Sequence, residues 1–544
     1  MATVEPAETH APAGLRRSRA APGSLDWALQ RALARGPRRT AVIDGDVRLT
    51  YAQLGNRVGA LCGGLARLGI VPGDVVAVLS LNSHRHLECW LGIPRSGAVL
   101  NDLNFRLAPA ELAFIVEDSR CVALIVDDAH LEIGRELRGR CETLRHLVYA
   151  GGQDAPEDTV AYESLVAGAP VPTADLSEGD LAGIFYTGGT TGLPKGAMLT
   201  HGNLLANAKH VLIGLGYRED DRYLHAAPMF HLADGGATYA LTWLGATHVI
   251  IPAFDPKLVA RTIEEQRVTI GVLVPTMINM LVNDPAAKQR DLSSLRRMIY
   301  GASPMPAEVQ RRAIELADCE WIQAYGMTEA APVVTVCDGV DQRAALAGEE
   351  PHATRLRSAG RPVIGVQAEV RHEDGSHCEP GDPGEVWVRG PNVMAGYWNR
   401  PEETAAALDA DGWYHSGDAA YADEDGYIYI VDRVKDMIIS GGENVYCAEV
   451  ENALHAHPDV LEAAVFGVPD PRWGERVHAA IVPRPGCEPS EDALTDHCRL
   501  LIAGYKLPRS FEFHTEPLPK SGAGKILKRR LREPHWEGRE GRVA

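Results

Sequence analysis

The sequence lacks the features that mark several large classes of protein. Its ten cysteines include no C-x-x-C pair, which argues against a disulfide framework and against a zinc ribbon. No apolar run approaches the roughly 20 residues that a membrane-spanning helix needs, and no apolar core of a secretory signal is visible near the N-terminus. We therefore expect a reduced, cytoplasmic protein without a membrane span.

The sequence also has fewer positively charged residues than negatively charged ones. The chain has 54 lysines and arginines against 73 aspartates and glutamates, a formal net charge of −19 at pH 7. Proteins that bind nucleic acid concentrate positive charge to displace counterions from the phosphate backbone, so no nucleic-acid partner is expected. A small anionic ligand stays possible, because it needs only a local group of donors.

The length of the chain predicts more than one folding unit, because 544 residues exceed what a single hydrophobic core usually holds. Residues 1–25, rich in Ala, Pro and Arg without periodicity, are expected to form a disordered tail. We place a large N-terminal domain at residues 26–432 and a small C-terminal domain at residues 433–544.

The large domain has the pattern of an α/β fold. Its runs with the character of buried strands are residues 75–79, 122–126, 184–186, 248–251, 270–274 and 298–300. Helix-length segments such as 258–266 and 306–316 separate several of these runs. The alternation predicts parallel-rich sheets with helices packed on their faces, and such sheets bind ligands at the carboxyl ends of their strands.

The pattern changes after Gly426. The elements expected beyond that point are a strand at 427–431, a charged break at 432–436, a helix at 448–456 and strands at 463–466 and 478–482. These are enough for a small α+β domain of its own. We expect the boundary between the two domains within residues 432–435.

A segment rich in glycine and threonine, Tyr186–Gly196, has the composition of a phosphate-binding loop. Its glycines can adopt positive φ, which lets consecutive backbone N–H groups point into one concavity. The donors are Thr187, Gly188, Gly189, Thr190, Thr191, Gly192 and Lys195. A Walker A loop needs glycine directly before the lysine, but Pro194 stands there. The segment therefore predicts phosphate binding in a different fold.

Seven motifs together identify a resemblance. Tyr186–Gly196 resembles the signature loop of the adenylate-forming superfamily, which includes acyl- and aryl-CoA synthetases, firefly-type luciferases and adenylation domains of peptide synthetases. The further motifs, in the family's order, are Pro228–Leu232, Tyr300–Pro304, Tyr325–Glu329, Trp413–Asp418, Asp432–Asp436 and Pro519–Lys525. The match is closest to acyl-CoA synthetases for fatty or aryl acids, of which Gly441–Tyr446 is typical.

The resemblance implies an enzyme, an AMP-forming acid–CoA ligase that uses ATP, Mg²⁺ and coenzyme A. ATP-dependent adenylation of a fatty or aryl carboxylic acid would give acyl-AMP and pyrophosphate, and transfer to CoA would give acyl-CoA and AMP. Alternatives that keep the ATP half-reaction are carrier-protein loading and nitrite-dependent, diazotase-like activation of an aryl amine. Luciferase-like oxygenation has no supporting feature, and intact Glu329, Asp418 and Lys525 argue against a non-catalytic nucleotide-binding module.

The same resemblance assigns roles at the nucleotide. Thr328 would offer its hydroxyl to the α-phosphate, Glu329 would bind Mg²⁺, and Lys525 would stabilise the charge of the transition state. Asp418, assisted by Arg433, would accept hydrogen bonds from the ribose, and the ring of Tyr325 would stack on adenine. The full set that is implied to bind ATP or AMP is Thr187, Gly188, Gly189, Thr190, Thr191, Lys195, Gly301, Ala302, Ser303, Tyr325, Gly326, Thr328, Asp418, Arg433 and Lys525.

The remaining roles concern the acid, CoA and the motion of the small domain. The resemblance implies two roles for His231, as a catalytic residue and as the gate of the acyl pocket. The other residues of this pocket are Asp234, Gly235 and Ala324. Asp234 would pair with an amine of an aryl acid if it faces inward. Lys435 would be the hinge about which the small, mobile domain rotates, and Gly441 and Gly442 would line the CoA channel. The partner is a small carboxylic acid, and the protein is expected to be a monomer or homodimer.

Overall fold

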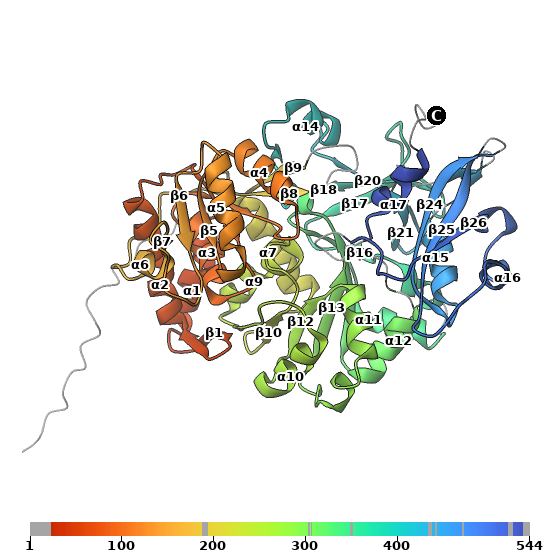
Figure 1. Ribbon diagram of the computed structural model, residues 1–544, viewed down its shortest axis with the longest axis horizontal. Helices are drawn as coiled ribbons and strands as arrows, with labels where there is room; N and C mark the ends of the chain where they lie inside the picture. Colours follow the sequence, from red (N-terminus) through yellow and green to blue (C-terminus); the bar gives the residue numbers. More distant parts are fainter. Residues whose placement is uncertain are drawn as a thin grey trace, which may run out of the picture.

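A computed structural model provides the structure of the chain. It describes residues 23–187, 194–302, 305, 307–348, 352–433, 438–440, 443–445, 447–470, 473–520 and 526–536. These residues form an α/β structure with four sheets, and the elements of the C-terminal part, drawn in blue, lie together at one end of the molecule (Figure 1). The predicted fold class is confirmed. No helix in the described ranges has both the length and the apolar character needed to cross a membrane.

One large sheet has eight strands and a parallel core. In spatial order the strands are β19 (Gly396–Tyr397), β9 (Lys195–Thr200), β8 (Leu181–Thr187), β4 (Val99–Asp102), β3 (Val75–Leu79), β5 (Cys121–Val126), β6 (His146–Tyr149) and β7 (Val160–Ala161). Every residue of β3 is buried, because helices cover both faces of a parallel sheet. The helices of this part are α2 (Tyr51–Arg67), α3 (His84–Arg95), α4 (Pro109–Asp118), α5 (Leu131–Arg140) and α6 (Tyr162–Val166).

The second large sheet has nine strands. In spatial order they are β16 (Arg361–Pro362), β15 (Val333–Cys337), β14 (Glu320–Gly326), β13 (Arg297–Gly301), β12 (Ile270–Leu273), β10 (Arg222–His225), β11 (Thr247–Ile250), β1 (Thr40–Asp44) and β2 (Val47–Thr50). Its helices include α7 (His201–Gly214), α8 (Leu232–Gly235), α9 (Ala237–Leu244), α10 (Pro256–Gln266), α11 (Pro275–Asn283) and α12 (Ala307–Leu316). Residues of α7 and α9 share one hydrophobic core with strands of both large sheets, so the two sheets form a single body.

Local sequence signals explain where helices begin. The Thr50 hydroxyl accepts a hydrogen bond from the backbone N–H of Gln53 at 3.3 Å, and the Gln53 side chain accepts one from the backbone N–H of Thr50 at 2.8 Å. This capping box starts α2. Asp255 caps α10 by accepting from the backbone N–H of Leu258 at 2.8 Å, and Pro256 is its first residue. The helix predicted at 258–266 lies within α10.

A third sheet is antiparallel and joins the body to the C-terminal part. Its strands are β17 (Gln367–Arg371), β18 (Gly384–Arg389), β20 (Tyr414–Ala422) and β21 (Ile428–Arg433). Residues 434–437, on which part of the predicted domain boundary falls, lie outside the described residues. The limits at 432 and 433 therefore stay a prediction.

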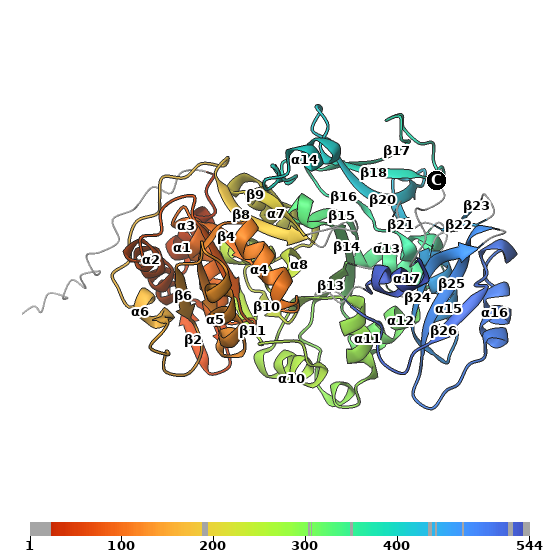
Figure 2. The same ribbon diagram turned by 45° about the horizontal axis from the view of Figure 1, so that its top comes forward.

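The C-terminal part has a sheet with different helices on its two faces. Its strands are β22 (Ile438–Ser440), β23 (Glu443–Val445), β24 (Val460–Asp470), β25 (Gly474–Pro483) and β26 (Ser510–Phe513), and its helices are α15 (Cys447–His455), α16 (Glu491–Arg499) and α17 (Lys528–Trp536). Val465 and Ala479 pack in the core with α15 and α16, whereas Phe466 and Ala480 pack in the core with Leu531 of α17. Figure 2 shows this sheet with α17 close to β24. The strands predicted at 463–466 and 478–482 are the centres of longer strands.

Candidate functional site

The carboxylate of Glu329 lies where the two large sheets meet. Glu329 belongs to a short 3-10 turn, η3 (Thr328–Ala330), directly after β14, and the residue is 9% exposed. Its Oε1 accepts a hydrogen bond from the Tyr397 hydroxyl at 3.0 Å and lies 3.5 Å from the hydroxyl of Thr187, the last residue of β8. Donors from the eight-stranded sheet therefore orient a carboxylate that the nine-stranded sheet supplies.

A lysine lies over the ring of the tyrosine that holds this carboxylate. Lys195 begins β9, and its ammonium lies over the ring of Tyr397 at 5.2 Å from the centroid, a cation–π arrangement. Strand pairing sets this geometry, because Tyr397 of β19 pairs with Ala197 of β9. Thr187 and Lys195 lie near the two ends of the predicted phosphate loop. Thr187 thus contacts Glu329 directly, and Lys195 is linked to it through the ring of Tyr397.

Asp118 holds the start of the loop. Its Oδ2 accepts from the Tyr186 hydroxyl at 2.6 Å, and its Oδ1 accepts from Arg400 at 2.9 Å. Its backbone carbonyl accepts from the Trp398 indole at 3.0 Å. Burial and the hydrogen bond to Asp118 raise the pKa of Tyr186, so the hydroxyl stays a donor. The end of α4, strand β8 and the residues that follow β19 are therefore fixed to one another.

A second carboxylate of the predicted site lies on another sheet. Asp418 of β20 is 7% exposed, and its Oδ2 accepts from the Tyr325 hydroxyl at 2.7 Å. The backbone N–H of Asp418 donates to the Ser416 hydroxyl at 3.0 Å. The β20–β21 register pairs Asp418 with Arg433, whose side chain lies outside what the structure describes. Tyr325 and Asp418 thus present a ring and a carboxylate at the end of β14.

The backbone at the ends of β13 and β14 leaves no space for a side chain at two glycines. A Cβ on Gly301 would lie 2.2 Å from the carbonyl oxygen of Ala324, and one on Gly326 would lie 1.8 Å from that of Pro332. Ala302 follows with a left-handed φ of 69°, a conformation that is unusual for a residue with a Cβ. The neighbouring backbone therefore requires glycine at these two positions at the ends of β13 and β14.

His231 is a half-buried residue at the start of α8. Burial, and then the charge of Arg106, lowers its pKa to about 4, so the ring is neutral at pH 7. Its ring packs against Phe230 with centroids 4.6 Å apart. Nε2 is buried and has no hydrogen-bond partner among the described residues. The gate that the sequence motif predicts at this residue stays a prediction.

The carboxylate of Asp234 is fully occupied by protein donors. It is completely buried, and it accepts from the Tyr223 hydroxyl at 3.0 Å and pairs with His225 Nδ1 at 2.7 Å. His225 continues to His248 at 2.9 Å, and burial lowers the pKa of His248 well below its usual value. The expected pairing of Asp234 with a substrate amine has no support in these contacts, because both oxygens already bind the frame.

Several predicted site residues cannot be placed. Gly188, Gly189, Thr190, Thr191, Ser303, Lys435, Gly441, Gly442 and Lys525 lie outside the described residues. Two residues that the structure adds are Tyr397 and Asp118, which sequence reasoning missed. Their contacts depend on β19 pairing with β9 and on the end of α4 reaching the loop, and neither has a local signal in the sequence.

Comparison with known proteins identifies both parts of the chain. Residues 29–398 match the family model described as AMP-binding enzyme, and residues 449–525 match the AMP-binding enzyme C-terminal domain. A feruloyl-CoA synthase from Amycolatopsis sp is 44% identical over 517 residues, which cover 94% of this chain and 98% of that protein. A long-chain-fatty-acid–CoA ligase from Thermus thermophilus is 38% identical, covering 93% and 94%.

A solved structure supports the same grouping. The anthranilate CoA ligase AuaEII in complex with anthranoyl-AMP aligns with a TM-score of 0.85 and 29% sequence identity, covering 94% of this chain and 97% of that one.

The packing around Gly235 of α8 predicts how a larger side chain at this position would change the stability of the protein. A Cβ on Gly235 would lie 2.2 Å from the carbonyl oxygen of Met229 and 2.3 Å from the ring of Trp90. Since neither the backbone nor a fully buried indole can retreat, we expect Gly235→Ala to lower the free energy of unfolding by about 3 kcal/mol. Chemical denaturation followed by circular dichroism measures the change.

Gly139→Ala is the matched control. Gly139 lies in α5, and a Cβ added to it would have no other atom within 4 Å, so alanine should be neutral or stabilise by up to about 1 kcal/mol. An equal loss of stability in both variants would contradict the crowding at Gly235.

Proposed function

Because the chain belongs to the AMP-binding enzyme family, we propose that its acid substrate is an aryl acid of the hydroxycinnamate type. The observation that carries this choice is the 44% identity to a feruloyl-CoA synthase, against 38% to a long-chain-fatty-acid–CoA ligase over a similar share of the chain.

The activity itself is that of an AMP-forming acid–CoA ligase, which uses ATP, Mg²⁺ and CoA. The carboxylate of the acid attacks the α-phosphorus of ATP, and pyrophosphate leaves. The thiol of CoA then attacks the carbonyl of the acyl-AMP, the thiol proton is released, and AMP leaves. Carrier-protein loading and nitrite activation are not favoured, because the relatives at 44% and 38% identity are CoA ligases.

We assign the phosphates of ATP to the place where Thr187, Lys195 and Glu329 meet. Both reactants of the first step are anions, so the site must supply cations and donors where negative charge moves. Lys195 supplies a fixed charge, and Thr187 and Thr328 supply hydroxyls. The buried Glu329 carboxylate, which the Tyr397 hydroxyl orients at 3.0 Å, fits Mg²⁺ as a hard oxygen ligand. Bound Mg²⁺ would neutralise phosphate charge.

We assign the nucleoside to the ends of β13 and β14. The family resemblance assigns Gly301, Ala302 and Gly326 to this site, and Tyr325 offers its ring for stacking. Asp418, held by the Tyr325 hydroxyl at 2.7 Å, can accept hydrogen bonds from the ribose hydroxyls. Arg433, its cross-strand neighbour, is proposed to assist.

The acyl group is assigned to the region around α8. His231, neutral at pH 7 because its pKa lies at about 4, is proposed to separate the acyl pocket from the path of CoA. Gly235 and Ala324 are proposed as pocket walls. Asp234 has a positioning role in this proposal, because its contacts with Tyr223 and His225 fix α8.

The second half-reaction requires movement of the small domain. We propose domains at residues 26–432 and 433–544, with Lys435 as the hinge, Lys525 at the adenylation transition state, and Gly441 and Gly442 beside the CoA thiol. We also propose that the protein is cytoplasmic and a monomer or homodimer.

A substrate panel tests the choice of acid. ATP–pyrophosphate exchange should be compared for hydroxycinnamates, benzoates, fatty acids of several lengths and nitrite, followed by mass spectrometry for the thioester after CoA is added. We expect kcat/KM for a hydroxycinnamate to exceed that for any fatty acid by at least about tenfold, the value of one or two well-placed contacts. A fatty acid that reacts faster would overturn the proposal for the acid but not the ligase activity.

Loss of Lys525 separates chemistry from binding. Lys525→Ala should abolish pyrophosphate exchange and leave the affinity for ATP within about threefold, because the ammonium acts on charge that develops only in the transition state. Calorimetry measures the affinity. Lys520→Ala is the control, since Lys520 pairs with Glu462 within the small domain and should keep its exchange activity.

Tyr397→Phe tests the positioning of Glu329. The variant keeps the ring under Lys195 but removes the hydrogen bond to Oε1, and a hydrogen bond to a charged group contributes about 1.5–3 kcal/mol. We expect kcat/KM for ATP to fall about tenfold or more, with a higher Mg²⁺ concentration needed for half-maximal activity. Tyr429→Phe removes a similar hydrogen bond, to Asp423 at 2.9 Å, and should change neither value.

A further inference from the structure

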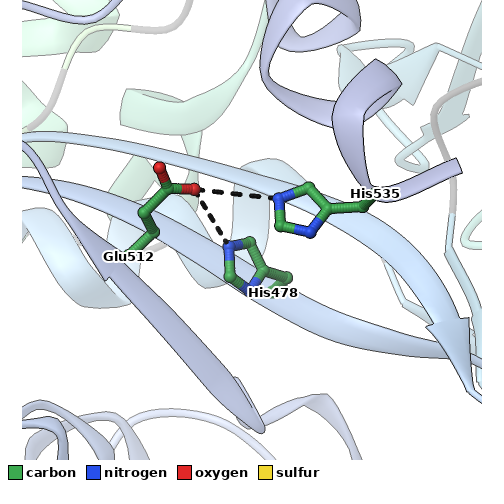
Figure 3. A group of neighbouring side chains, drawn as sticks. All are labelled: His478, Glu512 and His535. Carbon is green, nitrogen blue, oxygen red and sulfur yellow. Dashed lines mark ion pairs between the residues drawn. The ribbon is translucent and has the colours of Figure 1, made fainter. Parts of the chain in front are cut away.

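The C-terminal domain holds a group of metal-binding side chains that the ligase reaction does not use. His478 on β25, Glu512 on β26 and His535 on α17 point toward one another (Figure 3). Glu512 Oε2 lies 3.8 Å from His478 Nε2 and 3.7 Å from His535 Nε2, and one ligand atom from each residue lies within 4.8 Å of the others. This is the only such group of three or more among the described residues.

The sheet places these side chains on one face. Residues with even numbers on β24 and β25, such as Phe466 and Ala480, face the core that contains Leu531 of α17. His478 shares that face, and its ring packs against both Phe466 and His535, at centroid distances of 5.1 and 4.8 Å. Ala480 pairs with Glu512 in the β25–β26 register, so Glu512 stands beside the same face.

His478 has an unused nitrogen directed at the group. The residue is only 4% exposed, and its buried Nε2 has no hydrogen-bond partner among the described residues. Its Nδ1 lies 2.7 Å from the Ser510 hydroxyl. A hydroxyl that accepts from Nδ1–H leaves Nε2 as a lone pair, the arrangement that orients metal-binding histidines.

We propose that His478, Glu512 and His535 bind a divalent first-row transition metal ion, with Zn²⁺ as the best match. Two ligand atoms on a tetrahedral zinc ion lie about 3.4 Å apart, and Glu512 Oε2 is within a few tenths of an ångström of that distance from both imidazoles; the side chains of Glu512 and His535 are partly exposed and have room to adjust. Two imidazoles and one carboxylate favour zinc over Mg²⁺, which prefers oxygen ligands. The site is therefore distinct from the Mg²⁺ that accompanies ATP.

A bound ion would fasten α17 to the sheet. Lys528 at the start of α17 pairs with Glu451 of α15 at 2.8 Å, and Trp536 at its end donates to the carbonyl of Gly467 at 3.1 Å. A metal bound by His535 adds a bond between α17 and two strands. The surroundings limit the affinity, because the charge of Arg476 also acts on His478.

Zinc binding to the whole protein tests the proposal. Protein freed of metal with EDTA is titrated with ZnCl₂ near neutral pH by calorimetry, with millimolar MgCl₂ present in a second series, and we expect one ion per chain in both. Glu512→Gln and His535→Ala should each weaken binding at least about tenfold. These two side chains are 45% and 32% exposed, so the variants should fold, whereas His478 is buried. Hydrogen exchange in residues 528–536 should slow with zinc in the wild type and not in Glu512→Gln.

Cys378→Ser is the control that tests whether zinc binds instead at a second pair of side chains, Cys378 and His372. Cys378 Sγ lies 3.4 Å from His372 Nδ1 on the surface of the large domain. The variant should bind zinc as the wild type does. The proposal is overturned if zinc does not bind, if Glu512→Gln and His535→Ala bind as tightly as the wild type, or if Cys378→Ser alone loses the ion.

Discussion

The hydrogen bond between the Tyr397 hydroxyl and the Glu329 carboxylate is the contact on which the arrangement of the site depends. It joins a strand of the eight-stranded sheet to the turn that follows β14 of the nine-stranded sheet. A buried carboxylate is costly unless donors satisfy it, so the relative position of the two sheets is specified by the same contact that aims the carboxylate. Lys195 lies over the same tyrosine ring. The packing of the two sheets and the orientation of the proposed Mg²⁺ ligand therefore depend on one group of atoms.

The sequence predicted those parts of the fold and site that local patterns encode. Buried strands such as β3 read as continuous apolar runs, and the order of seven motifs identified the ligase chemistry. The resemblance to a known family assigned Thr187, Lys195 and Glu329 to one site, and the structure places the Thr187 hydroxyl 3.5 Å from the Glu329 carboxylate. Strand lengths were underestimated in β24 and β25, where both faces are covered and polar residues interrupt the apolar runs.

What the sequence could not predict depends on contacts between distant segments. Tyr397 reaches Glu329 only because β19 pairs with β9. The partners of Asp234 are Tyr223 and His225, on a strand that α8 covers, and no spacing distinguishes a carboxylate bonded there from one that faces a ligand. The three proposed zinc ligands lie far apart in the chain and meet only through the β25–β26 register and the placement of α17.

The isolated bridge between Lys520 and Ile526 ties two residues on either side of the predicted catalytic lysine to the C-terminal part of the chain. Lys520 also pairs with Glu462 of β24, and Ile526 packs against the core that contains Phe466. If Lys525 acts as proposed, its distance from the substrate would therefore depend on the position of the whole C-terminal part.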